Sequence, residues 1–199
     1  TQYYPHPGWV EHDAIEIWQV TCQDITDLVS TYNVQDQVIA IGVTNQRETT
    51  VVWDRRTGNP IHPAIVWQCR RTSGICLDLK LRGLEGKIKS KTGLVTDPYF
   101  SATKISWILD QVDNARSLAD HGHLAFGTID SWLLWNLTDG TSHATDQTNA
   151  SRTMLFNIHE QQWDDKLLEI FGVPAIMLPD VEECASDFGT TEPDLLGGA

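Results

Sequence analysis

An arginine and a glutamate stand next to each other at positions 47 and 48, just after the short apolar run 38–43. Arg47 offers a fork of N–H donors and Glu48 a carboxylate acceptor, so the pair could hold hydroxyl groups, which both donate and accept hydrogen bonds. The same two residues could instead form an internal salt bridge or point to opposite faces of a strand, because perturbed ion pairs are often purely structural. Taken alone, Arg47 and Glu48 leave a binding role and a structural role equally open.

Two aromatic residues could complete a site for a small polyol. Trp67 ends the apolar run 64–67, where its ring could lie against the carbon skeleton of such a ligand, although a lone Trp is more often part of the core. Tyr99 follows Asp97-Pro98, which predicts a loop. Its hydroxyl could contact a ligand, or its ring could serve only to anchor that loop.

Other charged clusters favour structural roles. Arg70 and Arg71 could hold a phosphate, but we expect them to form the solvated start of a helix. The polar run 146–153 could line a cleft, although turns produce such runs as well. Asp164 and Asp165 have the composition of a metal pair, and we expect them instead to complement the N-terminal dipole of a helix.

The composition excludes several classes of function. The net charge of −13 argues against nucleic acid and anionic membrane surfaces as partners, because both need clustered Lys and Arg. No apolar run reaches the length of a membrane span, and no signal peptide is visible, so we expect a cytoplasmic protein. The four cysteines form no Cys-x-x-Cys pair and no zinc pattern, which predicts reduced, mostly buried thiols and no metal site. Neither a Walker-type loop nor Gly-x-Gly-x-x-Gly is present, so no segment cradles a nucleotide by itself.

The elements that must position these side chains follow from the spacing of apolar residues. The run 38–43 is continuous and rich in β-branched residues, which predicts a strand buried on both faces, and ligands of open α/β sheets bind beyond the carboxyl ends of such strands. Strands mixed with helices predict an α/β domain with a mixed sheet flanked by helices. The further expected elements are strands at 50–53, 64–67 and within 151–158, and helices at 18–32, 75–79, from a cap at Ser101 to 112, at 129–133 and at 163–171.

Several multi-residue blocks follow one another over almost the whole chain. They are Pro7-Gly8-Trp9-Val10-Glu11-His12-Asp13, Thr44-Asn45-Gln46-Arg47-Glu48-Thr49, Ala64-Ile65-Val66-Trp67-Gln68-Cys69-Arg70-Arg71-Thr72, Gly93-Leu94 with Asp97-Pro98-Tyr99-Phe100, and Thr148-Asn149-Ala150-Ser151-Arg152-Thr153-Met154-Leu155-Phe156-Asn157. In type, order and spacing these blocks resemble the FGGY carbohydrate kinases, and within that family the glycerol kinases.

The resemblance implies a ribonuclease H-like, actin-like ATPase fold and transfer of a phosphoryl group from ATP, with Mg²⁺, to a terminal hydroxyl of glycerol. It also implies substrate-binding roles: Arg47 and Glu48 would bind the hydroxyls of glycerol, Trp67 would pack against its carbons, and Tyr99 would contact it as well. The alternatives are a kinase for another polyol or ketose, such as xylulose, and a non-catalytic polyol-binding module.

The resemblance further implies that residues 1–199 are a partial N-terminal, acceptor-binding domain. The family's first phosphate-binding hairpin would precede Thr1, and the catalytic base and the nucleotide-binding domain would follow Ala199. We therefore expect no catalytic, ATP-binding or metal-binding residue in this chain and no kinase activity from it alone. We expect the complete protein to be a homodimer or homotetramer.

Overall fold

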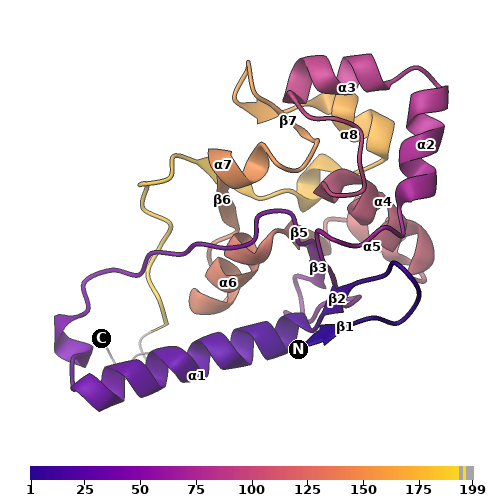
Figure 1. The fold of residues 1–199 in the computed structure, drawn as a ribbon. Helices are drawn as coiled ribbons and strands as arrows, with labels where there is room; N and C mark the ends of the chain where they lie inside the picture. Colours follow the sequence, from indigo (N-terminus) through magenta and orange to yellow (C-terminus); the bar gives the residue numbers. More distant parts are fainter. Residues whose placement is uncertain (193–194, 196–199) are drawn as a thin grey trace.

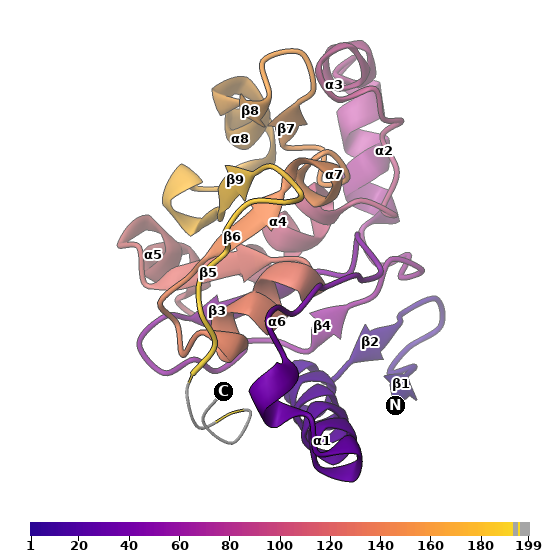
Figure 2. The same ribbon diagram turned by 90° about the vertical axis from the view of Figure 1, so that its left-hand side faces the viewer.

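The computed structural model describes residues 1–192 and 195 of the chain, which form an α/β arrangement of short strands and packed helices (Figure 1). The described strands group into four small sheets. Figure 2 shows β3 and β5 within the body of the molecule and the long helix α1 at one side of it. The strands are β1 (Gln2–Tyr3), β2 (Glu11–His12), β3 (Val51–Asp54), β4 (Ala64–Ile65), β5 (Leu124–Gly127), β6 (Ala144–Asp146), β7 (Phe156–Asn157), β8 (Gln162–Trp163) and β9 (Asp180–Glu182).

Sheet pairing brings together segments that are far apart in the sequence. β3 and β5 are antiparallel and fully buried, β6 and β9 are parallel, and β7 pairs with β8. The fourth sheet has the order β1-β2-β4, and an antiparallel bridge between Thr50 and Ile65 joins β4 to the start of β3. The bridge lies close in sequence to two predicted site residues, since Glu48 stands two residues before Thr50 and Trp67 two residues after Ile65.

The helices cover these sheets and supply most of the core. α1 starts at the N-cap Asp13, whose side chain accepts hydrogen bonds from two backbone N–H groups, and it ends at Asn33 in a left-handed conformation. Figure 1 shows that α1 extends well beyond the body. The helices are α1 (Ala14–Tyr32), α2 (Ser73–Leu81), α3 (Glu85–Thr92), α4 (Ser101–Gln111), α5 (Ala115–Asp120), α6 (Ile129–Leu137), α7 (Gln147–Ala150) and α8 (Asp165–Phe171), with 3₁₀ turns at Gln35–Gln37 and Ala175–Met177.

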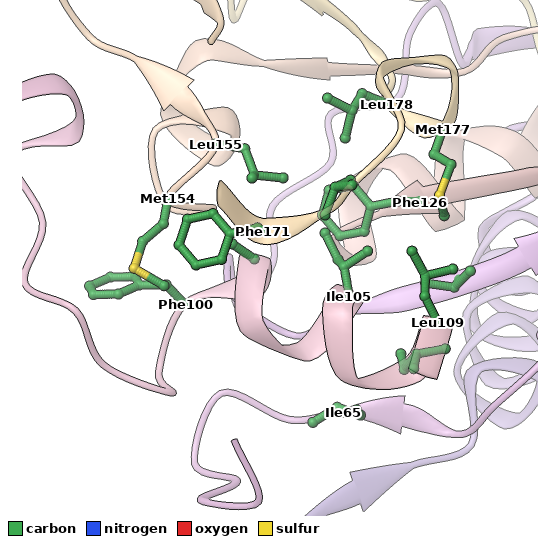
Figure 3. Close-up of a cluster of buried hydrophobic side chains, with 14 of the residues drawn as sticks. Ile65, Phe100, Ile105, Leu109, Phe126, Met154, Leu155, Phe171, Met177 and Leu178 are labelled. Carbon is green, nitrogen blue, oxygen red and sulfur yellow. The ribbon is translucent and has the colours of Figure 1, made fainter. Parts of the chain in front are cut away.

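The main core lies around α4, whose apolar face meets β5 and α8. Ile105 and Leu109 point from α4 into a cluster with Phe126 of β5 and Phe171 of α8 (Figure 3). The prediction that Ser101 caps α4 is wrong: Phe100 occupies the N-cap position, and no side chain caps this end. The hydroxyl of Ser101 instead donates a hydrogen bond to the main-chain oxygen of Glu48 at 3.4 Å, so the start of α4 is tied to the predicted site.

The predicted strand 38–43 is not formed. Residues 38–46 are extended without pairing to any described strand, and Ile39 is 98% exposed. Together with residues 184–191, this apolar segment lines a groove of about 610 Å³ whose floor includes Asp130 and Ala144. A continuous apolar run predicts burial only if neighbouring strands cover it, and within the described residues none does.

All four cysteines are free thiols. Cys69 and Cys76 are buried as predicted, and burial raises the pKa of Cys76 to about 11. Cys184 is exposed and Cys22 is half-buried, so the expectation of mostly buried thiols holds for only two of the four.

Candidate functional site

The structure brings three of the four predicted site residues together. The rings of Trp67 and Tyr99 lie 5.3 Å apart between centroids at an angle of 56°. Glu48 is buried beside them, and its carboxylate Oε1 accepts a hydrogen bond of 2.7 Å from Nε of Arg152. The guanidinium of Arg152 also lies over the ring of Tyr99, 5.8 Å from its centroid. Arg152 therefore connects the carboxylate of Glu48 to the aromatic wall, by which we mean the rings of Trp67 and Tyr99.

Arg47, the fourth predicted residue, is exposed in a turn and makes no hydrogen bond or ion pair with the described residues. Its loop is fixed two residues earlier, where Nδ2 of Asn45 donates to Oδ1 of Asp130 at 2.9 Å. Thr145 donates to Oδ2 of Asp130 at 2.6 Å, and Thr128 donates to Oδ1. The loop is thus held at Asn45 and at Glu48, which leaves the guanidinium of Arg47 free to reach a ligand.

The anchor of this loop is the half-buried carboxylate of Asp130. Burial raises the pKa of Asp130, and the hydrogen bonds from Thr128 and Thr145 oppose that shift because they favour the ionised form. Since every named partner of Asp130 is a donor, the network suits an ionised acceptor.

Asp97 fixes the loop that carries Tyr99. Its Oδ1 accepts hydrogen bonds from the backbone N–H of Tyr99 at 2.9 Å and from Nη1 of Arg70 at 2.8 Å. Arg70 is exposed, as predicted, but it holds the Tyr99 loop against the segment that carries Trp67.

Arg71 contradicts the prediction of a solvated helix start. Its side chain is 0% exposed, and its guanidinium lies against the rings of Trp9 and Trp107, at 4.0 and 4.8 Å from their centroids. Nη2 donates to Glu11 at 2.6 Å. Aromatic faces and one carboxylate make this cation part of the core, because a buried guanidinium needs such partners.

Sequence reasoning missed two residues of this site. Arg152 lies in the polar run 146–153 and carried no distinguishing signal there. Lys104 did carry a signal, because it shares the apolar face of α4 with Ile105 and Ile108, and a charged residue is unusual on such a face. Its Nζ donates to the main-chain oxygens of Glu48 at 3.0 Å and Tyr99 at 2.6 Å.

The arrangement suits a small polyhydroxylated ligand. A buried carboxylate and a free guanidinium can accept and donate hydrogen bonds to hydroxyls, and the indole of Trp67 offers a flat apolar surface for carbons. Across residues 1–192 and 195, no group of three or more His, Cys, Asp or Glu side chains is placed to hold a metal ion. None of the described helices is both long and apolar enough to cross a membrane.

Comparison with known proteins identifies the family. The family model described as the N-terminal domain of the FGGY family of carbohydrate kinases matches residues 1–199. The glycerol kinase of Alcanivorax borkumensis is 61% identical over all 199 residues, and these cover 40% of its length. The chain therefore spans about two fifths of the length of this curated relative.

Solved structures extend the comparison. The crystal structure of Plasmodium falciparum glycerol kinase with ADP matches with a TM-score of 0.93 and 36% identity, over 98% of this chain and 39% of that one. A xylulose kinase from Rhodospirillum rubrum has a TM-score of 0.86 at 19% identity, over 99% of this chain and 40% of that one, which shows a shared fold alone. The actin-like, ribonuclease H-like α/β fold expected from the sequence is thereby confirmed, and the chain belongs to the FGGY family of carbohydrate kinases, in which it matches the N-terminal domain.

Proposed function

We propose that residues 1–199 form the acceptor-binding part of a glycerol kinase, which transfers the γ-phosphoryl group of ATP to a terminal hydroxyl of glycerol. The observation that carries this proposal is the convergence of Glu48, Trp67 and Tyr99 on one site. The 61% identity to a glycerol kinase supports glycerol, rather than a sugar, as the acceptor.

Each site residue then has a defined role. The carboxylate of Glu48 and the guanidinium of Arg47 bind hydroxyls of glycerol, and the indole of Trp67 packs against its carbons. Tyr99 adds a phenol to the same wall. Arg152 orients the Glu48 carboxylate and partly neutralises it, so the carboxylate meets the acceptor in one fixed direction.

The remaining chemistry belongs to other parts of the complete protein. Phosphoryl transfer depends on positioning and on neutralising charge around the transferred group, which ATP-bound Mg²⁺ supplies in such enzymes. We place the binding of ATP and Mg²⁺ and the catalytic base in other parts of the complete protein, as the family resemblance implies.

We further propose that the complete protein works in the cytoplasm as a homodimer or homotetramer. These assignments rest on the family resemblance. Sedimentation of the complete protein, with and without glycerol, measures the oligomer, and a monomer under both conditions would contradict this assignment.

The test is acceptor-dependent ADP formation by the complete polypeptide that contains this sequence. With ATP and Mg²⁺, we expect ADP formation that depends on glycerol and is at least about tenfold more efficient in kcat/KM than with xylulose, because the two additional carbons of xylulose have to be accommodated beside Trp67 and Tyr99. Preference for xylulose would make the protein a ketose kinase. Glycerol binding by calorimetry without any ADP formation would make it a non-catalytic module.

The separate chain of 199 residues should form no ADP from ATP and glycerol above the enzyme-free background. It holds only part of the acceptor pocket, and positioning of both reactants is the main source of catalysis in phosphoryl transfer. Turnover by the purified chain would show that it binds both substrates and would overturn the proposed division.

A further inference from the structure

Lys104 is enclosed completely, although lysine is almost never fully buried without partners. It is 0% exposed, among the largest fully buried side chains of the described chain, and lies in the first turn of α4. The cost of removing an amine from water is offset only when its hydrogen bonds are remade inside the protein. Its position therefore has to be explained by what Nζ binds.

Nζ binds two main-chain carbonyl oxygens that belong to predicted glycerol-binding residues. It donates to Glu48 at 3.0 Å and to Tyr99 at 2.6 Å. These residues are 51 positions apart in the sequence and come from different loops. One side chain thus connects the loop that ends at β3 to the loop that precedes α4.

The connection holds in either charge state of the amine. An ammonium has three N–H donors and a neutral amine has two, so both forms can serve two carbonyls. Burial lowers the pKa of Lys104 to about 7, while the nearby Cys69, Glu48, Asp97 and Cys76 act in the opposite direction. Two bonds to main chain therefore persist across neutral pH.

The main-chain atoms at 48 and 99 determine where the site side chains start. Arg152 can orient the carboxylate of Glu48, and the ring of Trp67 can support that of Tyr99, but neither contact fixes the two backbones relative to each other. The hydroxyl of Ser101 also reaches the main-chain oxygen of Glu48, at the longer distance of 3.4 Å, so Lys104 makes the closer tie. Small displacements matter here, because a shift of about 1 Å can reduce catalysis about a hundredfold.

We propose that Lys104 is a positioning residue for acceptor binding, which sets the separation of Glu48 and Tyr99 by holding both of their main-chain carbonyls. This inference rests on the proposed glycerol kinase activity. It assigns Lys104 no contact with glycerol or with the transferred phosphoryl group.

The experiment compares Lys104→Met and Ser106→Ala in the complete kinase. Methionine keeps most of the length of the lysine stem and removes the amine. Ser106 is a matched control on the same helix: it is buried, and its hydroxyl donates to the main-chain oxygens of Ala102 and Phe171 at 3.0 and 2.6 Å, away from the site.

For Lys104→Met we expect the KM for glycerol to rise about tenfold or more, and the KM for ATP to change less than about twofold, because only the acceptor loops lose their tie. Ser106→Ala should lower the urea midpoint and leave the glycerol KM within about twofold of wild type, since a lost buried hydrogen bond away from the site affects stability alone. Lys104→Gln keeps an N–H donor on a shorter side chain and should give an intermediate KM.

A glycerol KM within about twofold of wild type in Lys104→Met would overturn the inference, because a purely structural lysine would behave like Ser106. Lys104→Gln is judged by the same criterion if Lys104→Met does not accumulate as folded protein. Wild-type protein without activity on glycerol would defeat the proposed function separately. Hydrogen exchange then decides the role of Lys104: about tenfold faster exchange at both 47–50 and 98–101 in the variant supports it, and unchanged exchange overturns it.

Discussion

Arg47 is exposed and unpaired among the described residues, while Glu48 beside it is buried and paired with Arg152. Replacing Arg47 by methionine in the complete kinase should raise the KM for glycerol by about 10- to 100-fold and change kcat much less, because hydrogen bonds from a charged donor to hydroxyls act on ground state and transition state alike.

Arg82→Met is the matched control for that experiment. Arg82 is another exposed arginine, and among residues 1–192 and 195 it pairs only with Asp78, near the end of α2. Exposed pairs of this kind contribute about 0–1 kcal/mol, so the control should have wild-type kinetics. A wild-type glycerol KM in the Arg47 variant would remove Arg47 from the site.

Lys104 also makes stability depend on pH. Burial lowers its pKa from the ordinary value of 10.5 to about 7 in the folded chain, so the unfolded chain binds the additional proton between these two values. Stability rises with pH wherever the unfolded state holds more protons. The free energy of unfolding should therefore increase from about pH 7 to about pH 10.5, as the cost of burying a charged amine disappears, and it should decrease again as pH falls back toward 7.

The measurement is the difference in urea unfolding free energy between wild type and Lys104→Met at pH 7 and at pH 9. Other titrating groups are common to both proteins and largely cancel in the difference. Wild type should gain stability relative to the variant at the higher pH. A difference that does not change with pH would mean that Lys104 keeps its ordinary pKa in the folded protein.

At the scale of elements, the start of α8 depends on one of two adjacent aspartates. Asp164 accepts hydrogen bonds from the backbone N–H groups of Lys166 and Leu167, and its other oxygen binds Lys91 at 2.5 Å and Asn157 at 2.9 Å. This confirms the prediction that the acidic pair serves the helix N-terminus, and it shows that Asp164 also joins α8 to α3.

Asp164→Ala should therefore destabilise the protein by about 1–3 kcal/mol, because a cap and buried hydrogen bonds are lost together. Asp165→Ala is the control: Asp165 lies in the first turn of α8 and contributes mainly through the helix dipole, about 0.3–1 kcal/mol. Chemical denaturation of both variants measures the difference. Equal losses would show that charge near the helix end, and not the cap, is what matters.

The sequence predicted elements well where the local pattern determined them. α1, α2, α4, α6 and α8 were expected from apolar spacing, and all are formed. β5 and α3 were missed: β5 is a short strand buried at all four positions, so it shows no alternation of apolar and polar residues, and α3 carries a single buried aliphatic residue, Ile88. Such elements are formed by what packs on them, which the local sequence does not contain.

The same limit applies to the site. Glu48, Trp67 and Tyr99 were identified because a familiar set of blocks surrounds them. The contacts through Arg152 and Lys104 that join Glu48 to Tyr99 connect segments far apart in the sequence. Arg71 was wrongly predicted to be solvated, and Arg152 was missed. A cation in a polar segment is expected to be solvated unless its aromatic or acidic partners are known, and those partners lie elsewhere in the sequence.

At the scale of the whole molecule, the segment 38–43 is unusual for a protein surface, because it exposes apolar side chains on backbone that pairs with no described strand. Ile39 is 98%, Val43 43% and Ile41 37% exposed, on backbone that is not paired within the described chain. Extended apolar segments with free backbone groups promote association between chains.

We therefore expect the separate chain to self-associate with increasing concentration, and Ile39→Lys to reduce that association, because a charge on an open edge opposes pairing. Analytical ultracentrifugation provides the measurement. Val95→Lys is the control, since Val95 is also exposed, at 55%, but lies in a loop away from this segment. Equal effects of the two substitutions would trace the association to general surface charge.

The tie between Lys104 and two backbone oxygens also bears on how acceptor preference can be altered. Since the ammonium or amine holds peptide groups, the framework of the pocket does not depend on which side chains stand at 48 and 99. A mutant library that varies Glu48, Trp67 and Tyr99 while keeping Lys104 would sample new acceptor chemistries on an unchanged scaffold. In the same library without that lysine, the separation of the main chain at residues 48 and 99 would no longer be fixed, so differences between members could not be assigned to their side chains alone.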